Sequence, residues 1–160
     1  MHTKSHGFGL VEVLVGVAII SMSLVALFSV YTSYLRVEFG NIRIVKASFL
    51  IDEGLEVVRL LRDTSWTSNV GNVTNGTTYY LNWTGAAWQL TTTPSTIDTI
   101  YTRKVVFSPA YRDASSKLVS SGTLDVNTKG YTVTVIWPKQ NSTATTSKQV
   151  SSYITNMFTN

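Results

Sequence analysis

Residue types that can act as nucleophiles, general bases or metal ligands are scarce in this chain and unevenly placed. There is no cysteine, which excludes disulfides, thiolate metal sites and cysteine nucleophiles. The two histidines, His2 and His6, both precede Gly7. If the segment before Phe8 is removed, the rest of the chain has no histidine for a Ser-His-Asp triad or a zinc site. The sequence therefore predicts a protein that is not an enzyme and has no cofactor.

Glu12 is the acidic residue whose position most needs a functional explanation. It stands directly before the segment 13–35, which contains no charged residue. A helix of about 20 apolar residues spans the hydrocarbon core of a bilayer, so this segment is long enough to cross one. A carboxylate within such a helix costs roughly 2.5–3.5 kcal/mol on insertion scales, and it usually marks a functional position.

A secretory signal peptide or a plain signal anchor is the simpler interpretation of the apolar segment. A signal peptide has a shorter apolar core and a small-x-small cleavage site behind it, and residues 25–33 contain no clear site of that kind. The flanking basic residues do not by themselves place the N-terminus in the cytoplasm, because more of them follow the segment than precede it. They are Lys4 on one side and Arg36, Arg43 and Lys46 on the other.

A second, amphipathic helical pattern continues beyond the apolar segment. Between residues 42 and 63 apolar residues recur at spacings of three and four and form one stripe. The members of the stripe are Ala47, Ile51, Leu55, Val58 and Leu61. Charged residues occupy the opposite side, where Arg59 can form ion pairs with Glu56 and Asp63. The pattern predicts one helix over residues 8–62, about 80 Å long at 1.5 Å per residue.

Strand patterns replace the helical pattern after Asp63. Tyr131, Val133 and Val135 alternate with other residues at the period of two that is typical of a half-buried strand. The predicted strands cover residues 77–83, 87–92, 97–107, 130–137 and 147–154. Short strands with tight connections favour an antiparallel sheet, and the helical stripe can cover its apolar face. The predicted fold class is α+β.

One weaker pattern begins like a calcium-binding loop. Asp125 and Asn127 stand like the first ligands of a calcium loop, but Lys129 and Ile136 occupy later ligand positions. Residues 125–130 are therefore interpreted as a turn between strands, with calcium as the less favoured alternative.

Tryptophans at strand positions usually pack in a core, and an adhesive aromatic surface is the alternative for Trp66, Trp83, Trp88 and Trp137. Trp83 and Trp88 flank a predicted hairpin, where one of them is expected to be exposed.

The basic residues behind the net charge of +4 are scattered along the sequence, so no nucleic-acid partner is indicated.

The N-terminal residues Gly7-Phe8-Gly9-Leu10-Val11-Glu12, followed by the apolar segment, resemble the type IV prepilin motif. The resemblance implies that a prepilin peptidase cuts after Gly7 and methylates the new N-terminal Phe8. It also implies that Glu12, then the fifth residue, sets assembly and register between subunits. Two later stretches, 52–63 and 101–106, resemble PilV-type minor pilins, as does the strand that ends at Trp137.

The resemblance implies a pilin fold with four parts. They are a leader peptide (1–7), a transmembrane and filament-core helix (8–35), an amphipathic helix half (36–64) and a β-rich head (65–160). The implied partners are other pilin subunits, the prepilin peptidase, inner-membrane platform proteins and membrane lipid. The implied location is the inner membrane, as a single-pass precursor with a cytoplasmic N-terminus, and then an extracytoplasmic filament.

The chain departs from the family pattern in ways that favour a minor over a major pilin. Many members close a C-terminal loop with a disulfide, and many major pilins have a proline within the apolar helix, whereas this chain has no cysteine and no proline before Pro94. Gly9 also replaces a common threonine. A pseudopilin of a type II secretion or competence system is one alternative. A signal-anchored extracytoplasmic binding domain that does not polymerise is another.

Overall fold

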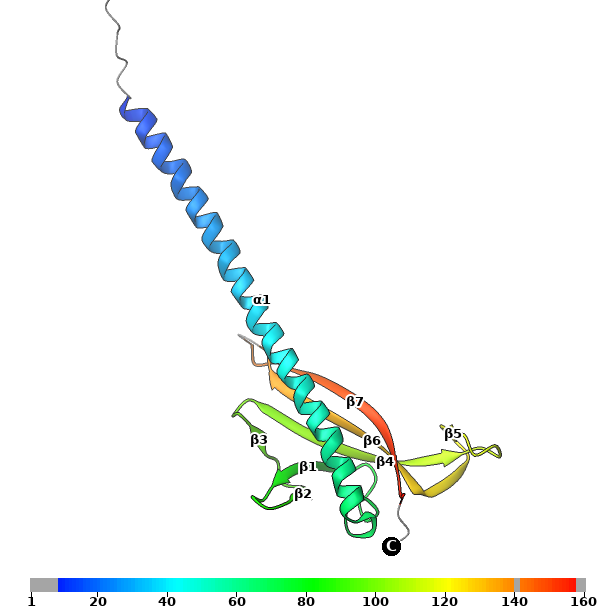
Figure 1. Cartoon of the computed structure of the whole chain (residues 1–160). Coiled ribbons are helices and arrows are strands. Elements are labelled where there is room, and N and C mark those ends of the chain that lie inside the picture. Colours follow the sequence, from blue (N-terminus) through cyan, green and yellow to red (C-terminus); the bar gives the residue numbers. More distant parts are fainter. Residues whose placement is uncertain (1–8, 140–141, 158–160) are drawn as a thin grey trace, which may run out of the picture. The chain divides into compact units, whose positions relative to one another are not determined.

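A computed structural model describes residues 9–139 and 142–157, and it contains one long helix followed by a β-sheet (Figure 1). The helix α1 runs without interruption over Leu10–Thr64. The prediction of a single helix is therefore confirmed, although Phe8 lies outside the described residues. The chain divides into two units, one up to Ile42 and one from Arg43 onward. The second unit, which contains the end of α1 and the whole sheet, is called the head below.

Local sequence explains why α1 is long and where it ends. No proline interrupts it, and although many of its residues are β-branched, their helix propensity is only slightly lower than that of leucine. It ends before Ser65, whose backbone is extended (φ −170°, ψ 116°) and whose hydroxyl accepts a hydrogen bond from the Ser68 amide at 3.2 Å. A short π-helical turn, η1 (Trp66–Val70), then leads the chain towards the sheet.

The sheet is antiparallel throughout. Its strands are β1 (Thr78–Trp83), β2 (Trp88–Thr91), β3 (Thr96–Ile97), β4 (Tyr101–Arg112), β5 (Leu118–Val119), β6 (Thr123–Pro138) and β7 (Thr145–Thr155). The main path runs β2-β1-β4-β6-β7, and the short strands β3 and β5 pair with the two ends of β4. A long helix followed by an antiparallel sheet of seven strands is α+β and consistent with the pilin fold, as predicted.

The predicted strands differ from the observed ones mainly in β4 and β6. Asp98 and Thr99 adopt positive φ angles (48° and 63°), and this turn splits the predicted strand 97–107 into β3 and β4. The predicted turn at residues 125–130 is wrong, because the whole segment belongs to β6. Gly130 serves close packing there: a Cβ atom would lie 2.5 Å from the Ser108 Oγ and 3.4 Å from the Tyr153 ring.

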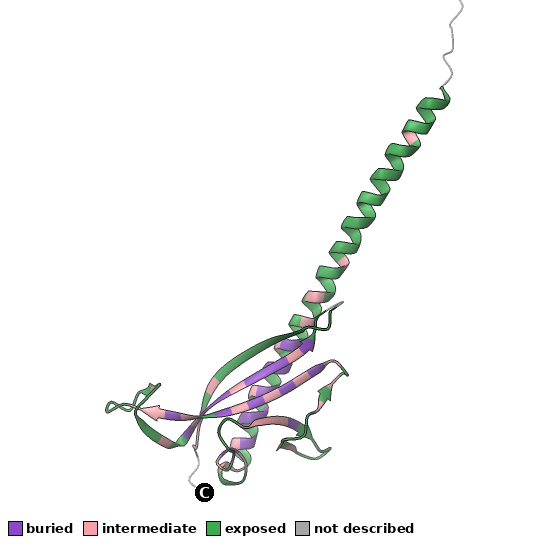
Figure 2. Cartoon of the chain, turned by 180° about the vertical axis from the view of Figure 1, so that it is seen from behind, coloured by how far each residue is buried: buried purple, intermediate pink, exposed green. Residues whose placement is uncertain are grey.

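The core of the head lies between the last part of α1 and one face of the sheet (Figure 2). The buried helix residues are Ala47, Leu50, Ile51, Gly54, Val57, Val58 and Leu61. They meet buried sheet residues, among them Tyr101, Phe107, Tyr131, Val133 and Val135. The predicted stripe is confirmed in four of its five members, whereas Leu55 is only partly buried.

Gly54 is the point of closest approach between helix and sheet. A Cβ atom on Gly54 would lie 2.8 Å from the Val133 Cγ1 and 3.1 Å from the Arg103 Cδ. Beside it, the Arg103 side chain is 2% exposed and donates to the Leu50 carbonyl (3.1 Å) and the Glu53 Oε2 (2.6 Å). A buried cation is tolerated only when it is paired and hydrogen-bonded, so these contacts tie the helix to β4.

The charged side of the helix pairs differently from the prediction at two positions. Glu56 pairs with Arg59 as predicted, but Asp63 pairs with Arg62 at 2.7 Å instead of with Arg59. Glu53 pairs with Arg103 of the sheet. Spacing along a helix reveals only local partners, so the sequence pattern could not identify a partner 50 residues away.

Beyond an irregularity between Pro109 and Tyr111, β4 and β6 continue with β5 into a hairpin arm. Arg112 holds this arm together through hydrogen bonds to Asp125 Oδ2 (2.6 Å), the Ser116 carbonyl (2.7 Å) and Thr128 Oγ1 (3.3 Å). The bond from Arg112 is the largest of the effects that lower the pKa of Asp125 below its ordinary value. The ionised form of Asp125 is therefore the one that the folded arm favours.

Replacing Gly54 by alanine should destabilise the head. The added methyl group would collide with Val133 and Arg103, and overpacking of this kind costs about 1–3 kcal/mol in the free energy of unfolding. Gly40→Ala is the matched control, since Gly40 is also helical but has open space where the Cβ would lie. Thermal unfolding of the detergent-solubilised chain, followed by aromatic circular dichroism, should show a lower Tm for Gly54→Ala alone. Equal Tm values for the two variants would contradict the packing described here.

Stability of the arm should depend on the ionisation of Asp125. Because the folded-state pKa is lowered, the contribution of Asp125 is fully present above its ordinary pKa and is lost as the pH falls through the folded-state value. Amide exchange in residues 112–128 should therefore be faster in Asp125→Asn than in the wild type at pH 7, and this difference should shrink towards about pH 3. Asp52→Asn, at an exposed helix position, provides the control. A difference that is the same at both pH values would refute the ion-pair explanation.

Candidate functional site

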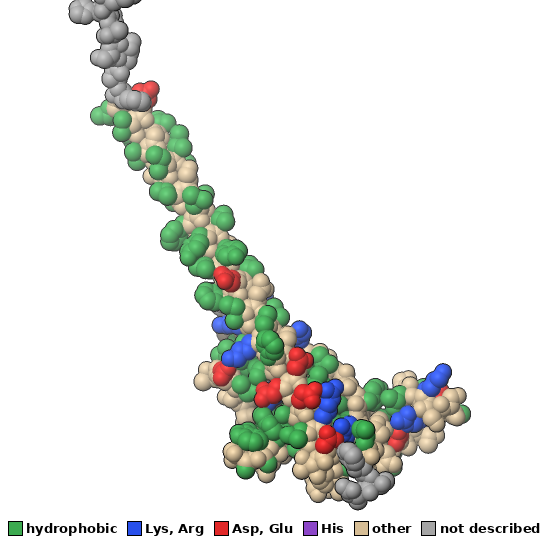
Figure 3. Space-filling model, in the orientation of Figure 1, with side chains coloured by type: hydrophobic (Ala, Val, Ile, Leu, Met, Phe, Trp, Pro, Cys, Tyr) green, Lys and Arg blue, Asp and Glu red, His purple; other side chains and the backbone are tan. Residues whose placement is uncertain are grey.

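The apolar first part of α1 is the most unusual surface in the described chain. Its large apolar side chains are exposed on every side of the helix, with Phe28 at 71% and Met22 at 73%, and Figure 3 shows hydrophobic side chains all along the visible face of this part. By length and composition this helix is able to cross a membrane. Exposed apolar surface of this extent marks a contact with lipid or with another protein, because water is an unfavourable neighbour for it.

Hydroxyl groups within this apolar part are satisfied inside the helix. Ser21 donates to the Val17 carbonyl at 2.8 Å, and Ser23 donates to the Ile19 carbonyl at 2.9 Å. In hydrocarbon every polar group has to find its partner within the protein, because no water is present to replace it. These bonds make the two serines compatible with a membrane interior.

Gly16 has no evident role within its own chain. A Cβ atom at this position would have nothing within 4 Å, yet glycine in a helix interior is about 1 kcal/mol less favourable than alanine. Small residues let two helices approach closely in an apolar environment. The sequence predicts this use for Gly9, Gly16, Ala18, Ser21 and Ser23, all of which lie at or near the exposed start of α1.

Glu12 lies in the first turn of α1 and is exposed. Its Oε2 accepts a hydrogen bond from the Gly9 amide at 3.3 Å, while its own amide donates to the Gly9 carbonyl at 3.0 Å. A carboxylate at this position satisfies a free amide and is favoured by the helix dipole. Gly7 and Phe8, the predicted cleavage and methylation positions, lie outside the described residues.

Asp125 and Asn127 lie close together on β6, but both carboxylate oxygens of Asp125 are already engaged. Asp125 Oδ1 accepts from the Asn127 amide at 3.0 Å, and Asp125 Oδ2 accepts from Arg112 at 2.6 Å. Within residues 9–139 and 142–157 no group of three or more acidic or histidine side chains is placed to hold a metal ion. A calcium ion at Asp125 would have to compete with the guanidinium of Arg112.

The four tryptophans divide between the core and the surface. Trp137 is buried, and Trp66 and Trp88 are partly buried against the core. Trp83 is 52% exposed and pairs with Trp88 across the β1–β2 hairpin, with ring centroids 5.5 Å apart. The expectation that one tryptophan is exposed beside this hairpin is confirmed for Trp83.

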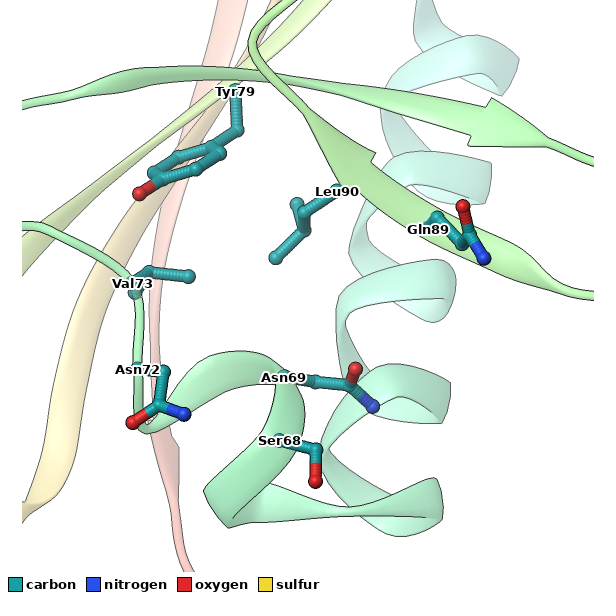
Figure 4. A pocket seen from close by; sticks show the side chains of 7 residues that line it. All are labelled: Ser68, Asn69, Asn72, Val73, Tyr79, Gln89 and Leu90. Atoms are coloured by element: carbon teal, nitrogen blue, oxygen red, sulfur yellow. The ribbon is translucent and has the colours of Figure 1, made fainter.

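One open cavity of about 340 Å³ lies between the end of the helical region and the β1–β2 hairpin (Figure 4). Its lining residues are Ser68, Asn69, Asn72, Val73, Tyr79, Gln89 and Leu90. Two of the polar groups serve the fold: Asn69 donates to the Leu61 carbonyl, and the Tyr79 hydroxyl accepts from the Thr74 amide. The lining contains no Asp, Glu, His, Lys or Arg, so it has no acid–base pair for catalysis. Its polar groups are able to form hydrogen bonds with a neutral polar molecule.

Comparison with known protein families gives a match at the N-terminus. The family model described as the prokaryotic N-terminal methylation motif matches residues 2–28, which include Gly7, Phe8 and Glu12 and extend into the exposed apolar helix. No curated protein and no solved structure matches the chain significantly. The motif supports a type IV pilin-like or pseudopilin precursor, which is a structural subunit rather than an enzyme. Such a precursor assembles with other pilins, is processed by prepilin peptidase and is anchored in a membrane, which fits the apolar helix.

Proposed function

We propose that this chain is a minor pilin, a structural subunit of a type IV pilus or a related filament. The observation that carries the proposal is the methylation-motif match over residues 2–28, which leads directly into a helix with exposed apolar residues on every side. Before assembly the inner membrane would cover this helix, and within a filament the equivalent helices of other subunits would cover it. The α+β head with its helix-covered sheet is consistent with such a subunit.

In this proposal, processing prepares the N-terminus for assembly. Prepilin peptidase cuts after Gly7, removes the leader 1–7 and methylates Phe8. The cut removes Lys4 and both histidines and creates a positively charged amine on Phe8. Residues 8–35 then form the membrane and filament-core helix, 36–64 the amphipathic half and 65–160 the head.

Glu12 gives the filament its register. Its carboxylate pairs with the Phe8 amine of a neighbouring subunit in a core from which water is excluded. An unpaired charge in such a core is strongly unfavourable, so only the arrangement in which amine and carboxylate meet is stable. The weak contact to the Gly9 amide, at 3.3 Å, leaves the exposed carboxylate accessible to this partner.

Two sequence features favour a minor pilin over a major one. They are the absence of cysteine and the absence of proline from the apolar helix. The likeness of residues 52–63 and 101–106 to PilV-type minor pilins points the same way. A pseudopilin of a secretion or competence system would use the same N-terminal segment. Detection of the chain in filaments sheared from the cell surface distinguishes the pilus subunit from a pseudopilin that stays within the envelope.

Replacing Glu12 by valine should block incorporation into filaments. The variant leaves the amine of the neighbouring subunit unpaired, and removing one partner of a buried pair costs about 3–5 kcal/mol. We therefore expect at least a tenfold decrease of the chain in sheared filaments, at an unchanged amount in the membrane. Quantitative immunoblotting of both fractions measures this.

Val13→Ile, which changes the adjacent residue without changing charge, is the matched control and should assemble normally. Normal incorporation of Glu12→Val would refute the register role. Absence of the wild-type chain from any filament would instead favour an anchored domain that does not polymerise.

A further inference from the structure

Four basic side chains gather at one end of the head, although the sequence separates them widely. They are Arg43, Lys46, Lys139 and Lys148, called the basic cluster below. Arg43 donates at 3.1 Å to the carbonyl of Pro138, the residue before Lys139, and Lys148 donates to the Ser48 hydroxyl at 2.8 Å. Lys46 pairs with Asp98 and lies over the Tyr101 ring, 5.8 Å from its centroid.

The sheet topology explains why these residues meet. In the antiparallel sheet the beginning of β4, the end of β6 and the beginning of β7 all lie at the same end. The first two turns of the helix in the head, from Arg43 to Ser48, contact this end. Sequence reasoning noted Arg43 and Lys46 but missed Lys139 and Lys148, because no local pattern connects residues about 100 positions apart.

The basic cluster carries an excess of positive charge that reaches solvent. One of the four cations, Lys46, forms an ion pair with the carboxylate of Asp98. Lys139 and Lys148 are exposed, and the side chain of Lys46 is 47% exposed. Figure 3 shows Lys and Arg side chains, with Asp and Glu side chains among them, around the beginning of the helix in the head. The cluster therefore presents a cationic surface rather than a set of closed ion pairs.

This cationic surface follows the membrane-length helix closely along the chain. Arg43 comes eight residues after Leu35, the end of the uncharged segment, which is about 12 Å of helix. The headgroup layer on each side of a bilayer is roughly 5–8 Å thick, and the Debye length is about 8 Å at physiological salt. When the apolar segment fills the hydrocarbon core, Arg43 is therefore within electrostatic reach of the lipid phosphates.

We propose that the basic cluster binds anionic phospholipid headgroups and seats the head on the bilayer before assembly. The inference rests on the membrane-held precursor of the proposed function. It accounts for the basic residues that follow the apolar segment, which the positive-inside tendency leaves unexplained. Each Lys or Arg near an anionic surface strengthens the attraction about fivefold, so four of them give a clear preference for anionic lipid.

The absence of cysteine permits a direct test on the full chain in nanodiscs. A single Thr145→Cys substitution, at the exposed start of β7 beside the cluster, takes a donor dye, and the lipid headgroups carry the acceptor. Energy transfer should be higher in nanodiscs of phosphatidylcholine mixed with phosphatidylglycerol than in phosphatidylcholine alone. High salt should abolish the difference, because it screens the charges.

Lys139→Gln with Lys148→Gln should weaken the preference for anionic nanodiscs by at least fivefold. Lys104→Gln with Lys117→Gln removes the same charge elsewhere on the head and should leave the preference unchanged. Equal transfer in both lipids, or an equal loss in both double variants, would overturn the inference. A cluster variant that assembles poorly but keeps its lipid preference would also overturn it and would indicate contact with a neighbouring subunit. Recovery of the chain with the nanodiscs is measured separately, and its failure would refute the membrane anchor instead.

Discussion

The first part of α1 exposes apolar side chains on every side, and this constraint governs the rest of the molecule. A helix that is apolar all round is stable only when something covers it, and the described chain leaves Phe28, Met22 and their neighbours uncovered. Lipid can cover such a helix, and so can other helices of the same kind. The serine hydroxyls bonded back to their own helix fit either environment, since neither provides water.

The second part of α1 solves a different problem, because there only one face is apolar. Gly54 lets this face approach the sheet, and Arg103 reaches from β4 to the Leu50 carbonyl and the Glu53 carboxylate. The guanidinium also lies 5.5 Å from the Trp88 ring centroid, so it connects the helix, β4 and the β1–β2 hairpin. Close packing and a compensated buried charge together hold the helix on the sheet, and the head can therefore fold while the apolar part is covered by other molecules.

Local patterns predict α1 and the main strands but not η1 or the short strand β5, and non-local contacts decide the details. The helix and its stripe followed from spacings of three and four, and the strand through Tyr131, Val133 and Val135 followed from alternation. The predicted turn at residues 125–130 is wrong because local sequence does not show that Ser108 and Tyr153 crowd Gly130 within β6. The Arg103–Glu53 pair and the contact of Arg43 with the Pro138 carbonyl depend on sheet register, which a single sequence does not reveal. Glu12 was recognisable because a charge beside an uncharged segment is a local anomaly.

The mass of the native protein tests most directly whether the chain is a processed filament subunit. Intact mass spectrometry with N-terminal sequencing should find a chain that begins at Phe8 and carries one additional methyl group on its amine. Such an N-terminus supplies the charge that Glu12 needs as a partner in a core without water. A native chain that retains residues 1–7 would contradict the account, because the amine would then lie seven residues away from the apolar helix that has to bring it to Glu12 of a neighbour.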